Sequence, residues 1–248
     1  MFARVNCIVA LLGSLLIMAS ASHLRAADPA LKVAIYSGSF EYKSHDTLKI
    51  LKEHLEKNYN VVCTLNLAKD ETTPIPGLDQ LQSCDVAIIF TRRLQLPEDQ
   101  IAQIKKYCDS GKGIVGIRTA SHAFQTWLDF DKLVLGGDYH NHYSKDLPAT
   151  LKFEEKAKGH PVLAGVKPFT TIGKLYKNPE PAADITRLIT AVTAEYSEPV
   201  AWVRVRPNNG RVFYTSLGVP EDFSDQNFLK LVSNAVLWTG GREPAKSK

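Results

Sequence analysis

The first half of the chain alternates short apolar runs with amphipathic stretches. The apolar runs have the length of strands and cover residues 31–36, 59–67, 85–91 and 114–118. Two stretches between them, 44–58 and 97–110, place their apolar side chains at helical spacing. Because strands that alternate with helices are typical of parallel sheets, this pattern predicts an α/β fold with a doubly wound, mostly parallel sheet.

The second half of the chain is β-rich and ends in a helix. Further strands are expected at residues 150–153, 169–176, 187–193, 200–206 and 211–216. The sequence Asn208-Asn209-Gly210 between the last two predicts a tight hairpin turn. A closing helix is expected over 226–238. We therefore predict one domain over residues 31–241 with β-rich C-terminal additions, followed by a disordered polar tail at 242–248.

The first 26 residues have the pattern of a secretory signal peptide. Their apolar run is about 11 residues long, whereas a membrane span needs roughly 20. Cleavage after Ala21 or Ala26 would leave a periplasmic or secreted protein without a membrane anchor. Loss of Arg4 and Arg25 reduces the 30 basic residues to 28, against 26 acidic residues. This near-neutral balance, without a basic stripe, argues against nucleic-acid binding.

Three cysteines, Cys63, Cys84 and Cys108, remain after removal of the predicted signal peptide. Their spacing matches no zinc motif. Cys84 and Cys108 lie at the same edge of one strand–helix unit, and an exported protein can form disulfides. The sequence leaves two alternatives open, a Cys84–Cys108 disulfide or three buried thiols.

A turn crowded with polar groups follows the predicted strand 114–118. Ligands of open α/β sheets bind outside the carboxyl ends of the strands, so chemistry is expected here. Arg118 either positions a substrate or forms an ion pair, because a buried guanidinium needs a partner. Ser121 either caps the following turn or, together with His122, contributes to a polar site.

Four segments of the chain together resemble the trehalose-utilisation (ThuA-like) family. They are Gly-Ile-Arg-Thr-Ala-Ser-His at 116–122, Gly-Gly-Asp-Tyr-His-Asn-His-Tyr at 136–143, Gly-His-Pro at 159–161 and Gly-Arg-Val-Phe-Tyr-Thr-Ser-Leu-Gly at 210–218. The resemblance extends over residues 32–241 and implies a flavodoxin-like sheet, similar to that of class I glutamine amidotransferases. It also implies a role in the metabolism of disaccharides or 3-keto sugars, beside sugar oxidoreductases.

Amidotransferase activity is not expected from this chain. Glutamine hydrolysis in this fold needs a Cys thiolate at the sharp turn after the strand, and Arg118 and Thr119 occupy that turn instead. The chain also departs from its relatives at two other places. Gly173-Lys174 stands where relatives often carry Asp-Glu, and Val219 stands where many carry His. Each difference removes a possible acid, base or ligand.

Four histidines are expected near one edge of the sheet. His45 follows the first strand, His122 follows the fourth, and the others lie in the loop at 136–145. The His-x-His spacing of His140 and His142 places both rings on one face of an extended segment. One interpretation is a divalent transition metal such as zinc, bound by His45, His140 and His142. A second is metal-free acid/base chemistry on a sugar, and a third is hydrogen bonding to loop backbone.

Aromatic side chains are expected around the same edge. Tyr36 and Phe40 follow the first strand, and Tyr139 and Tyr143 flank the paired histidines. Their apolar faces and polar rims suit the CH surfaces of sugars. These four side chains, with His45 and Ser121, are the predicted substrate-binding set.

The sequence thus predicts an exported protein that processes a disaccharide or a 3-keto sugar. His122, His140 and His142 are the predicted acid/base or metal-binding groups, and Arg118 positions the substrate. Two alternatives are a sugar-binding module without catalysis and a subunit that docks on a sugar oxidoreductase. Self-association into a homo-oligomer is left open.

Overall fold

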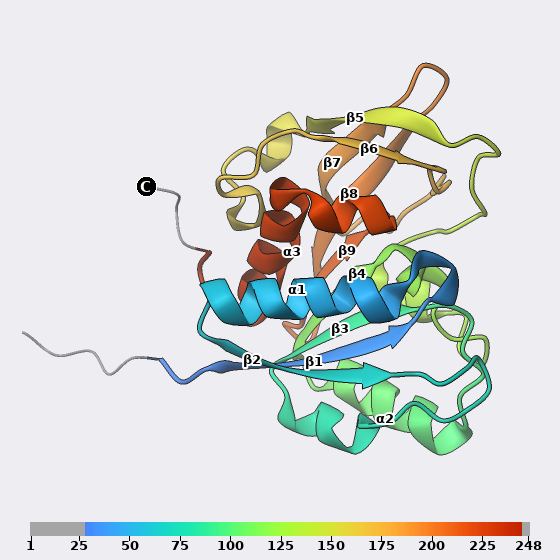
Figure 1. Cartoon of the computed structure of the whole chain (residues 1–248), viewed down its shortest axis with the longest axis vertical. Helices are drawn as coiled ribbons and strands as arrows, with labels where there is room; N and C mark the ends of the chain where they lie inside the picture. The colour runs from blue at the N-terminus through green and yellow to red at the C-terminus, as the bar shows by residue number, and fades with distance from the viewer. Residues whose placement is uncertain (1–27, 245–248) are drawn as a thin grey trace, which may run out of the picture.

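The structure, a computed structural model, describes residues 28–244. These residues form a nine-stranded mixed sheet with helices on both faces (Figure 1). The order of the strands across the sheet is β2-β1-β3-β4-β9-β8-β7-β5-β6. The α/β class predicted from the sequence is confirmed.

Five neighbouring strands form a parallel half. They are β1 (Leu31–Gly38), β2 (Val61–Leu67), β3 (Val86–Thr91), β4 (Gly113–Ile117) and β9 (Arg211–Thr215). Every residue of β3 and β4 is buried, as expected for central strands covered on both faces. All five carboxyl ends therefore meet at one edge of the sheet.

The other four strands extend the sheet by antiparallel pairing from β9. They are β5 (Leu147–Phe153), β6 (Thr170–Gly173), β7 (Ile185–Val192) and β8 (Ser197–Val205). The hairpin predicted between β8 and β9 is present, and Asn209 adopts the left-handed conformation with φ of 63°. The strand expected over 169–176 is shorter than predicted, because only Thr170–Gly173 pairs with β5.

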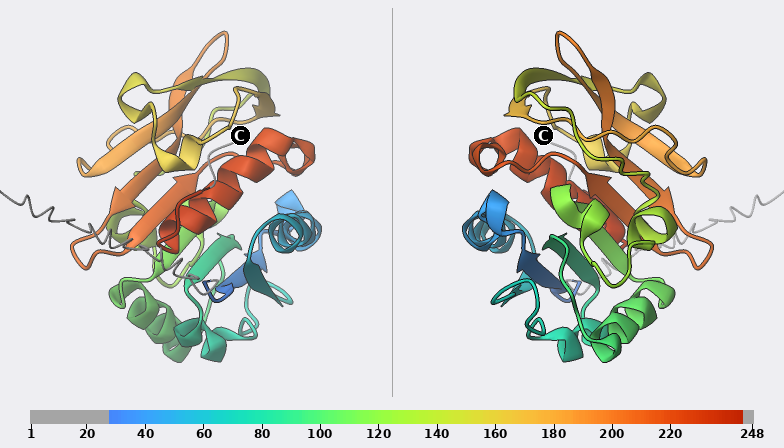
Figure 2. Two further views of the ribbon diagram at one scale, coloured as in Figure 1. Left: turned by 90° about the vertical axis from the view of Figure 1, so that its left-hand side faces the viewer. Right: turned by 90° about the vertical axis from the view of Figure 1, so that its right-hand side faces the viewer.

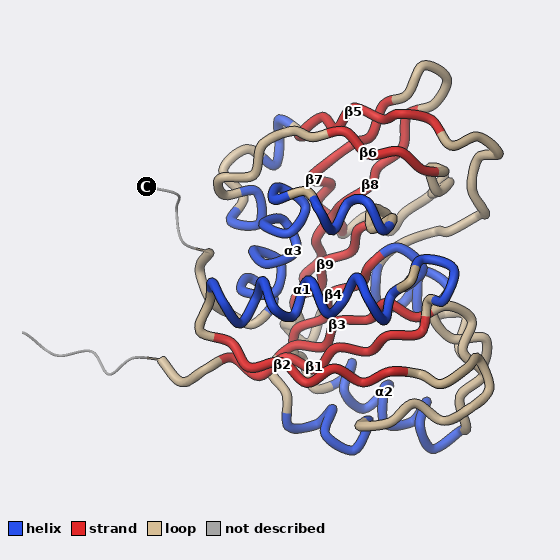
Figure 3. The backbone as a smooth tube through the Cα atoms, viewed as in Figure 1, coloured by secondary structure: helices blue, strands red, loops and turns tan. Residues whose placement is uncertain are grey.

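Helices cover both faces of the parallel half (Figures 2 and 3). One face carries α1 (Ser44–Asn58) and α3 (Gln226–Thr239), whose apolar side chains pack in one core with Val33 and Ile35 of β1. The opposite face carries α2 (Glu98–Asp109), which packs in a second core with Ala34 and Tyr36. Alternate residues of β1 thus enter alternate cores, as the period of a strand requires.

Both ends of the described chain bear on predictions made from the sequence. The predicted signal peptide lies outside the described residues. At the other end, the ordered chain continues past Gly241, because the Arg242 backbone N–H donates to the Leu237 carbonyl at 2.8 Å and its side chain donates to the Asn60 carbonyl at 2.9 Å. Within residues 28–244, no helix is both long enough and apolar enough to cross a membrane.

Of the two alternatives for the cysteines, a disulfide or three buried thiols, the structure shows the buried thiols. Cys63, Cys84 and Cys108 are free, buried thiols. Burial raises the pKa of Cys63 and of Cys108 to about 12 in each case, so neither is a thiolate at neutral pH. They act as small apolar side chains of the core.

Candidate functional site

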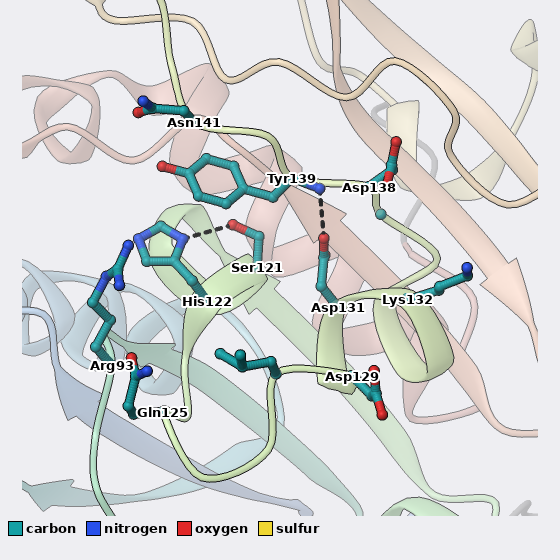
Figure 4. A pocket seen from close by; sticks show the side chains of 12 residues that line it. Arg93, Ser121, His122, Gln125, Asp129, Asp131, Lys132, Asp138, Tyr139 and Asn141 are labelled. Atoms are coloured by element: carbon teal, nitrogen blue, oxygen red, sulfur yellow. Dashed lines mark hydrogen bonds between the residues drawn. The ribbon is translucent and has the colours of Figure 1, made fainter.

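An open pocket of about 550 Å³ lies beyond the carboxyl ends of β3 and β4 (Figure 4). We call it the His122 pocket. It is lined by Arg93, Ser121, His122, Gln125, Leu128, Asp129, Asp131, Lys132, Gly137, Asp138, Tyr139 and Asn141. These residues come from the segment after β3, the segment after β4 and the loop at 136–145, which we call the His-rich loop. The sequence led us to expect the segment after β1 in place of the one after β3.

A strained turn connects β4 to the pocket. Arg118, the first residue after the strand, has a φ of +46°, a conformation that is uncommon for residues with a side chain. Its backbone carbonyl accepts a hydrogen bond from the Tyr214 hydroxyl at 2.8 Å, which holds the turn in place. The short helix η3 (Arg118–His122) then brings Ser121 and His122 to the pocket wall. Strain of this kind is characteristic of functional turns.

The Arg118 side chain is buried and does not line the pocket. Its guanidinium lies between the rings of Tyr42 and Tyr176, at 4.3 and 4.9 Å from their centroids. It donates to the Ser216 carbonyl at 2.7 Å and to the Tyr42 hydroxyl at 3.2 Å. Within residues 28–244 no carboxylate forms an ion pair with it, so the expected ionic partner is replaced by two aromatic rings and two oxygen acceptors.

Ser121 and His122 form a hydrogen-bonded pair at the pocket wall. The Ser121 Oγ lies 3.0 Å from His122 Nδ1, although side chains of adjacent residues usually point apart. The His122 ring stacks on Tyr139, with 4.4 Å between centroids and 16° between the ring planes. Burial, reinforced by the positive charges of Arg93 and Arg92, lowers the pKa of His122 to about 3. His122 is therefore a neutral imidazole at neutral pH.

Arg93 comes from the loop after β3 and was not singled out in the sequence. Its backbone is in the left-handed region, with φ of +49°, and its N–H donates to the His122 carbonyl at 2.8 Å. Figure 4 shows its guanidinium beside the His122 ring nitrogen that faces away from Ser121. Its position directly after a buried strand was the available signal, since β3 ends only two residues earlier.

Asp131, at the start of short helix η4 (Asp131–Leu135), is the second residue that sequence reasoning missed. Only 6% of it is exposed, yet it lines the pocket. Its Oδ2 accepts a hydrogen bond from the Tyr139 backbone N–H at 2.9 Å. Burial, with a smaller contribution from Asp138, raises its pKa to about 7. Its chain position, in a segment without a strand pattern, gave no signal of this burial.

The three histidines predicted to bind a metal form hydrogen bonds to different partners. His45 places Nδ1 at 3.0 Å from Ser37 Oγ and Nε2 at 2.9 Å from the Ala68 carbonyl, so both ring nitrogens are occupied. His140 Nε2 contacts Asp138 Oδ1 at 3.0 Å, and His142 Nδ1 contacts the Tyr143 carbonyl at 2.8 Å. In the described part of the chain, no group of three His, Cys, Asp or Glu side chains is arranged to hold a metal ion. The donor set thus does not fit the predicted zinc-like centre.

The predicted aromatic residues divide between the pocket and other places. Tyr139 lines the His122 pocket. Tyr36 is a core residue that donates from its hydroxyl to the Gly77 carbonyl at 3.1 Å. Phe40 is exposed, and its ring packs 5.3 Å from that of His45. Tyr143 donates to Glu198 Oε1 at 2.8 Å and stacks on Tyr196, so the structure places it away from the pocket.

Residues 32–239 match the model of the ThuA family, which is described as trehalose utilisation. The chain belongs to the trehalose-utilisation family. The match includes every residue of the His122 pocket, and it confirms the resemblance carried by the four sequence segments. Membership of the trehalose-utilisation family indicates a carbohydrate-related function. No curated protein matches the sequence.

Solved structures support the same assignment of the fold. A ThuA-like protein from Parabacteroides merdae superposes with a TM-score of 0.70 at 17% identity, over 88% of this chain and 93% of that one. A ThuA-like protein from Bacteroides uniformis gives 0.63 at 20% identity, over 88% and 96%. A glutamine amidotransferase from Thermotoga maritima gives 0.50 at 12% identity, over 86% and 99%. The trehalose-utilisation chain thus shares the amidotransferase-like fold.

Gly173 of β6 lies beside Arg118. A Cβ atom at Gly173 would lie 3.5 Å from Arg118 Nη2. Because Gly173 has no side chain, this position supplies no partner for the buried guanidinium.

Proposed function

We propose that this chain is an exported carbohydrate-processing enzyme that acts on a disaccharide or a 3-keto sugar at the His122 pocket. The observation that carries the proposal is the Ser121–His122 pair, held at 3.0 Å on the turn after β4 and facing an open, polar pocket. In open α/β sheets this edge is where ligands bind. Family membership adds the carbohydrate class of the ligand.

The hydrogen bonds of Ser121 favour one role for the His122 ring. The Ser121 hydroxyl donates to the Arg118 carbonyl at 3.4 Å, so its oxygen is free to accept from His122 Nδ1–H. The other ring nitrogen, Nε2, then carries a lone pair on the side of Arg93. A neutral imidazole with this tautomer accepts a hydrogen bond from a ligand hydroxyl, and Arg93 stabilises negative charge that develops on the ligand oxygen.

The composition of the pocket suits a sugar better than an ion. Arg93 and Lys132 supply positive charge and Asp129 and Asp138 supply negative charge, so neither sign dominates the wall. Hydroxyl groups of sugars both donate and accept, and therefore match such a mixed wall. The volume of about 550 Å³ lies within the range of roughly 300–1,000 Å³ that is typical of small-molecule sites.

Several predictions from the sequence remain as finer parts of this proposal. We propose export on the basis of residues 1–26, and a flavodoxin-like, doubly wound arrangement for the parallel half. His140 and His142 border the pocket through Asp138 and Asn141, and we assign them to loop positioning. We route no step through a metal, because the predicted ligands are engaged elsewhere.

A sugar-binding module without turnover is the second candidate, and one observation favours it. The pKa of His122, at about 3, makes its imidazole a weak base, although it remains a good hydrogen-bond acceptor. Docking on a sugar oxidoreductase and self-association are compatible with either function.

One experiment distinguishes the enzyme from the sugar-binding module. Trehalose and its 3-keto derivative are titrated into the wild-type protein, His122→Ala and His54→Ala by calorimetry, and product formation is followed in parallel. His54 is a matched control because it lies on α1, outside the pocket. If the wild type and His54→Ala bind and convert the sugar while His122→Ala does not convert it, the result supports the enzyme. If the wild type binds the sugar without converting it, and His122→Ala binds it more weakly, the result supports the module. Equal affinity together with equal turnover in all three proteins, or equal affinity with no turnover in any of them, would refute the pocket assignment.

A further inference from the structure

A buried carboxyl group lies directly beneath the His-rich loop. Asp131 is the first residue of helix η4. The backbone N–H groups of Gly136 and Gly137 both donate to the backbone carbonyl of Asp131, at 2.8 and 3.2 Å. A Cβ atom at Gly137 would lie only 2.2 Å from Asp131 Oδ1. Gly137 does not have a positive φ, so glycine is required here for space and not for conformation. The chain thus leaves room for this carboxyl group at the pocket wall.

One oxygen of this carboxyl group has no partner. Oδ2 accepts from the Tyr139 N–H, while Oδ1 is buried and makes no hydrogen bond to any of the residues described. An unpaired buried polar atom costs about 1–3 kcal/mol, and such atoms in native structures call for an explanation. Asp131 and Gly137 both line the pocket, so this unpaired oxygen belongs to a residue of the pocket wall.

Several charged and polar groups act on Asp131. The negative charge of Asp138 raises the pKa of Asp131 and His140 lowers it, while Tyr214 of β9 interacts electrostatically with the same carboxyl group. Asp138 is itself paired with His140 at 3.0 Å, which reduces its effect on Asp131. Burial raises the pKa of Asp131 to about 7, so this carboxyl group can hold a proton near neutral pH.

We propose that Asp131 is the residue that exchanges a proton with the ligand in the His122 pocket, an inference that rests on the proposed function. As a carboxylate, Asp131 takes the proton of a ligand hydroxyl through Oδ1. The ligand O–H bond breaks as the new O–H bond forms, and the electron pair stays on the ligand oxygen beside the Arg93 guanidinium. The reverse step returns the proton, so no other reactant is needed. His122 supplies a hydrogen bond and Asp131 supplies the proton chemistry.

The first test needs no ligand. Protein labelled with ¹³C at the Asp carboxyl groups is titrated by NMR in the wild type, Asp131→Asn and Asp129→Asn. We expect one resonance to titrate near pH 7, to vanish in Asp131→Asn and to persist in Asp129→Asn, which removes an exposed carboxylate of the same pocket. Asn preserves the size of the side chain and the acceptor for the Tyr139 N–H. A resonance that vanishes in Asp131→Asn but titrates near 4, as ordinary carboxyl groups do, would overturn the proposal.

The second test uses trehalose as the probe. Its binding heat is measured at pH 7 in buffers of different ionisation enthalpy, which reports the protons exchanged on binding. We expect a fractional proton exchange in the wild type and none in Asp131→Asn, with trehalose affinity changed less than tenfold. Equal proton exchange in both proteins would overturn the proposal. If trehalose and 3-keto-trehalose bind to neither protein, the proposed function fails, while the NMR titration still decides whether Asp131 is a neutral-pH proton carrier.

Discussion

Replacing Asp131 by Asn should change how the stability of the fold depends on pH. The folded-state pKa of Asp131 is raised by burial from an ordinary 3.8 to about 7. Between these two values the folded protein holds a proton that the unfolded chain has released. The free energy of unfolding of the wild type therefore falls as pH rises through this window, and becomes constant above it. Asn does not titrate, so its variant lacks this decrease.

The size of the effect follows from the width of the window. Each pKa unit corresponds to about 1.4 kcal/mol, so a shift from 3.8 to about 7 amounts to about 4 kcal/mol in total. Between pH 5 and pH 8 the wild type should lose about 3 kcal/mol relative to Asp131→Asn. Because Asp131 is only 6% exposed, solvent screening reduces this figure little.

Urea unfolding at pH 5, 6, 7 and 8, followed by circular dichroism, measures the difference between the two proteins at each pH. Subtracting the two curves removes other carboxyl groups that titrate, such as Asp222, whose pKa burial also raises. Asp129→Asn serves as the control, since it removes an exposed carboxylate from the same pocket. A wild-type curve that stays parallel to the Asp131→Asn curve from pH 5 to pH 8 would show that the buried carboxyl group has an ordinary pKa.

Four further outcomes are expected. Gly137→Ala should destabilise the fold by about 1–3 kcal/mol in urea unfolding, since its Cβ would lie 2.2 Å from Asp131 Oδ1; an unchanged midpoint would mean that the loop has room to spare. Trp202→Phe should cost about 2–3 kcal/mol in the same assay, because it removes the Nε1–H donor to the Leu135 carbonyl at 2.8 Å and leaves a gap in the core. The His122 ring should show constant ¹⁵N shifts from pH 8 to pH 5, and a titration near pH 6.5 would contradict the effect of burial. The buried thiols Cys63, Cys84 and Cys108 should resist iodoacetamide at pH 8 in the native protein and react after denaturation, and fast native labelling would show that the core opens.

The strands and helices could be predicted because local patterns determine them. Leu48, Leu51 and Leu55 share one helix face and are all fully buried, as their spacing indicates. The continuous apolar run of β3 indicates a strand buried on both faces, and β3 lies at the centre of the parallel half. The end of the strand expected at 169–176 could not be predicted, since pairing with β5 ends it at Gly173.

The pocket could be predicted only in part. Ser121 and His122 directly follow a recognisable strand, and Tyr139 lies in a recognisable loop, so their meeting was foreseeable. Asp131 becomes a buried wall residue only because Gly137 and Tyr139 fold back over it, which is a tertiary contact without a local signature. Likewise, no spacing rule indicates that the Ala68 carbonyl occupies His45 Nε2. Histidines near one edge do not by themselves form a ligand set.

The position of β9 has a consequence for how the chain acquires its fold. Ile114 of β4 pairs with Val212 of β9, so the sheet closes over a separation of roughly 100 residues. Before β9 pairs with it, β4 presents a row of unpaired backbone N–H and C=O groups between apolar side chains. Such an edge can pair with another chain and start aggregation. We therefore expect β4 to be the strand most exposed to mispairing until β9 has paired with it.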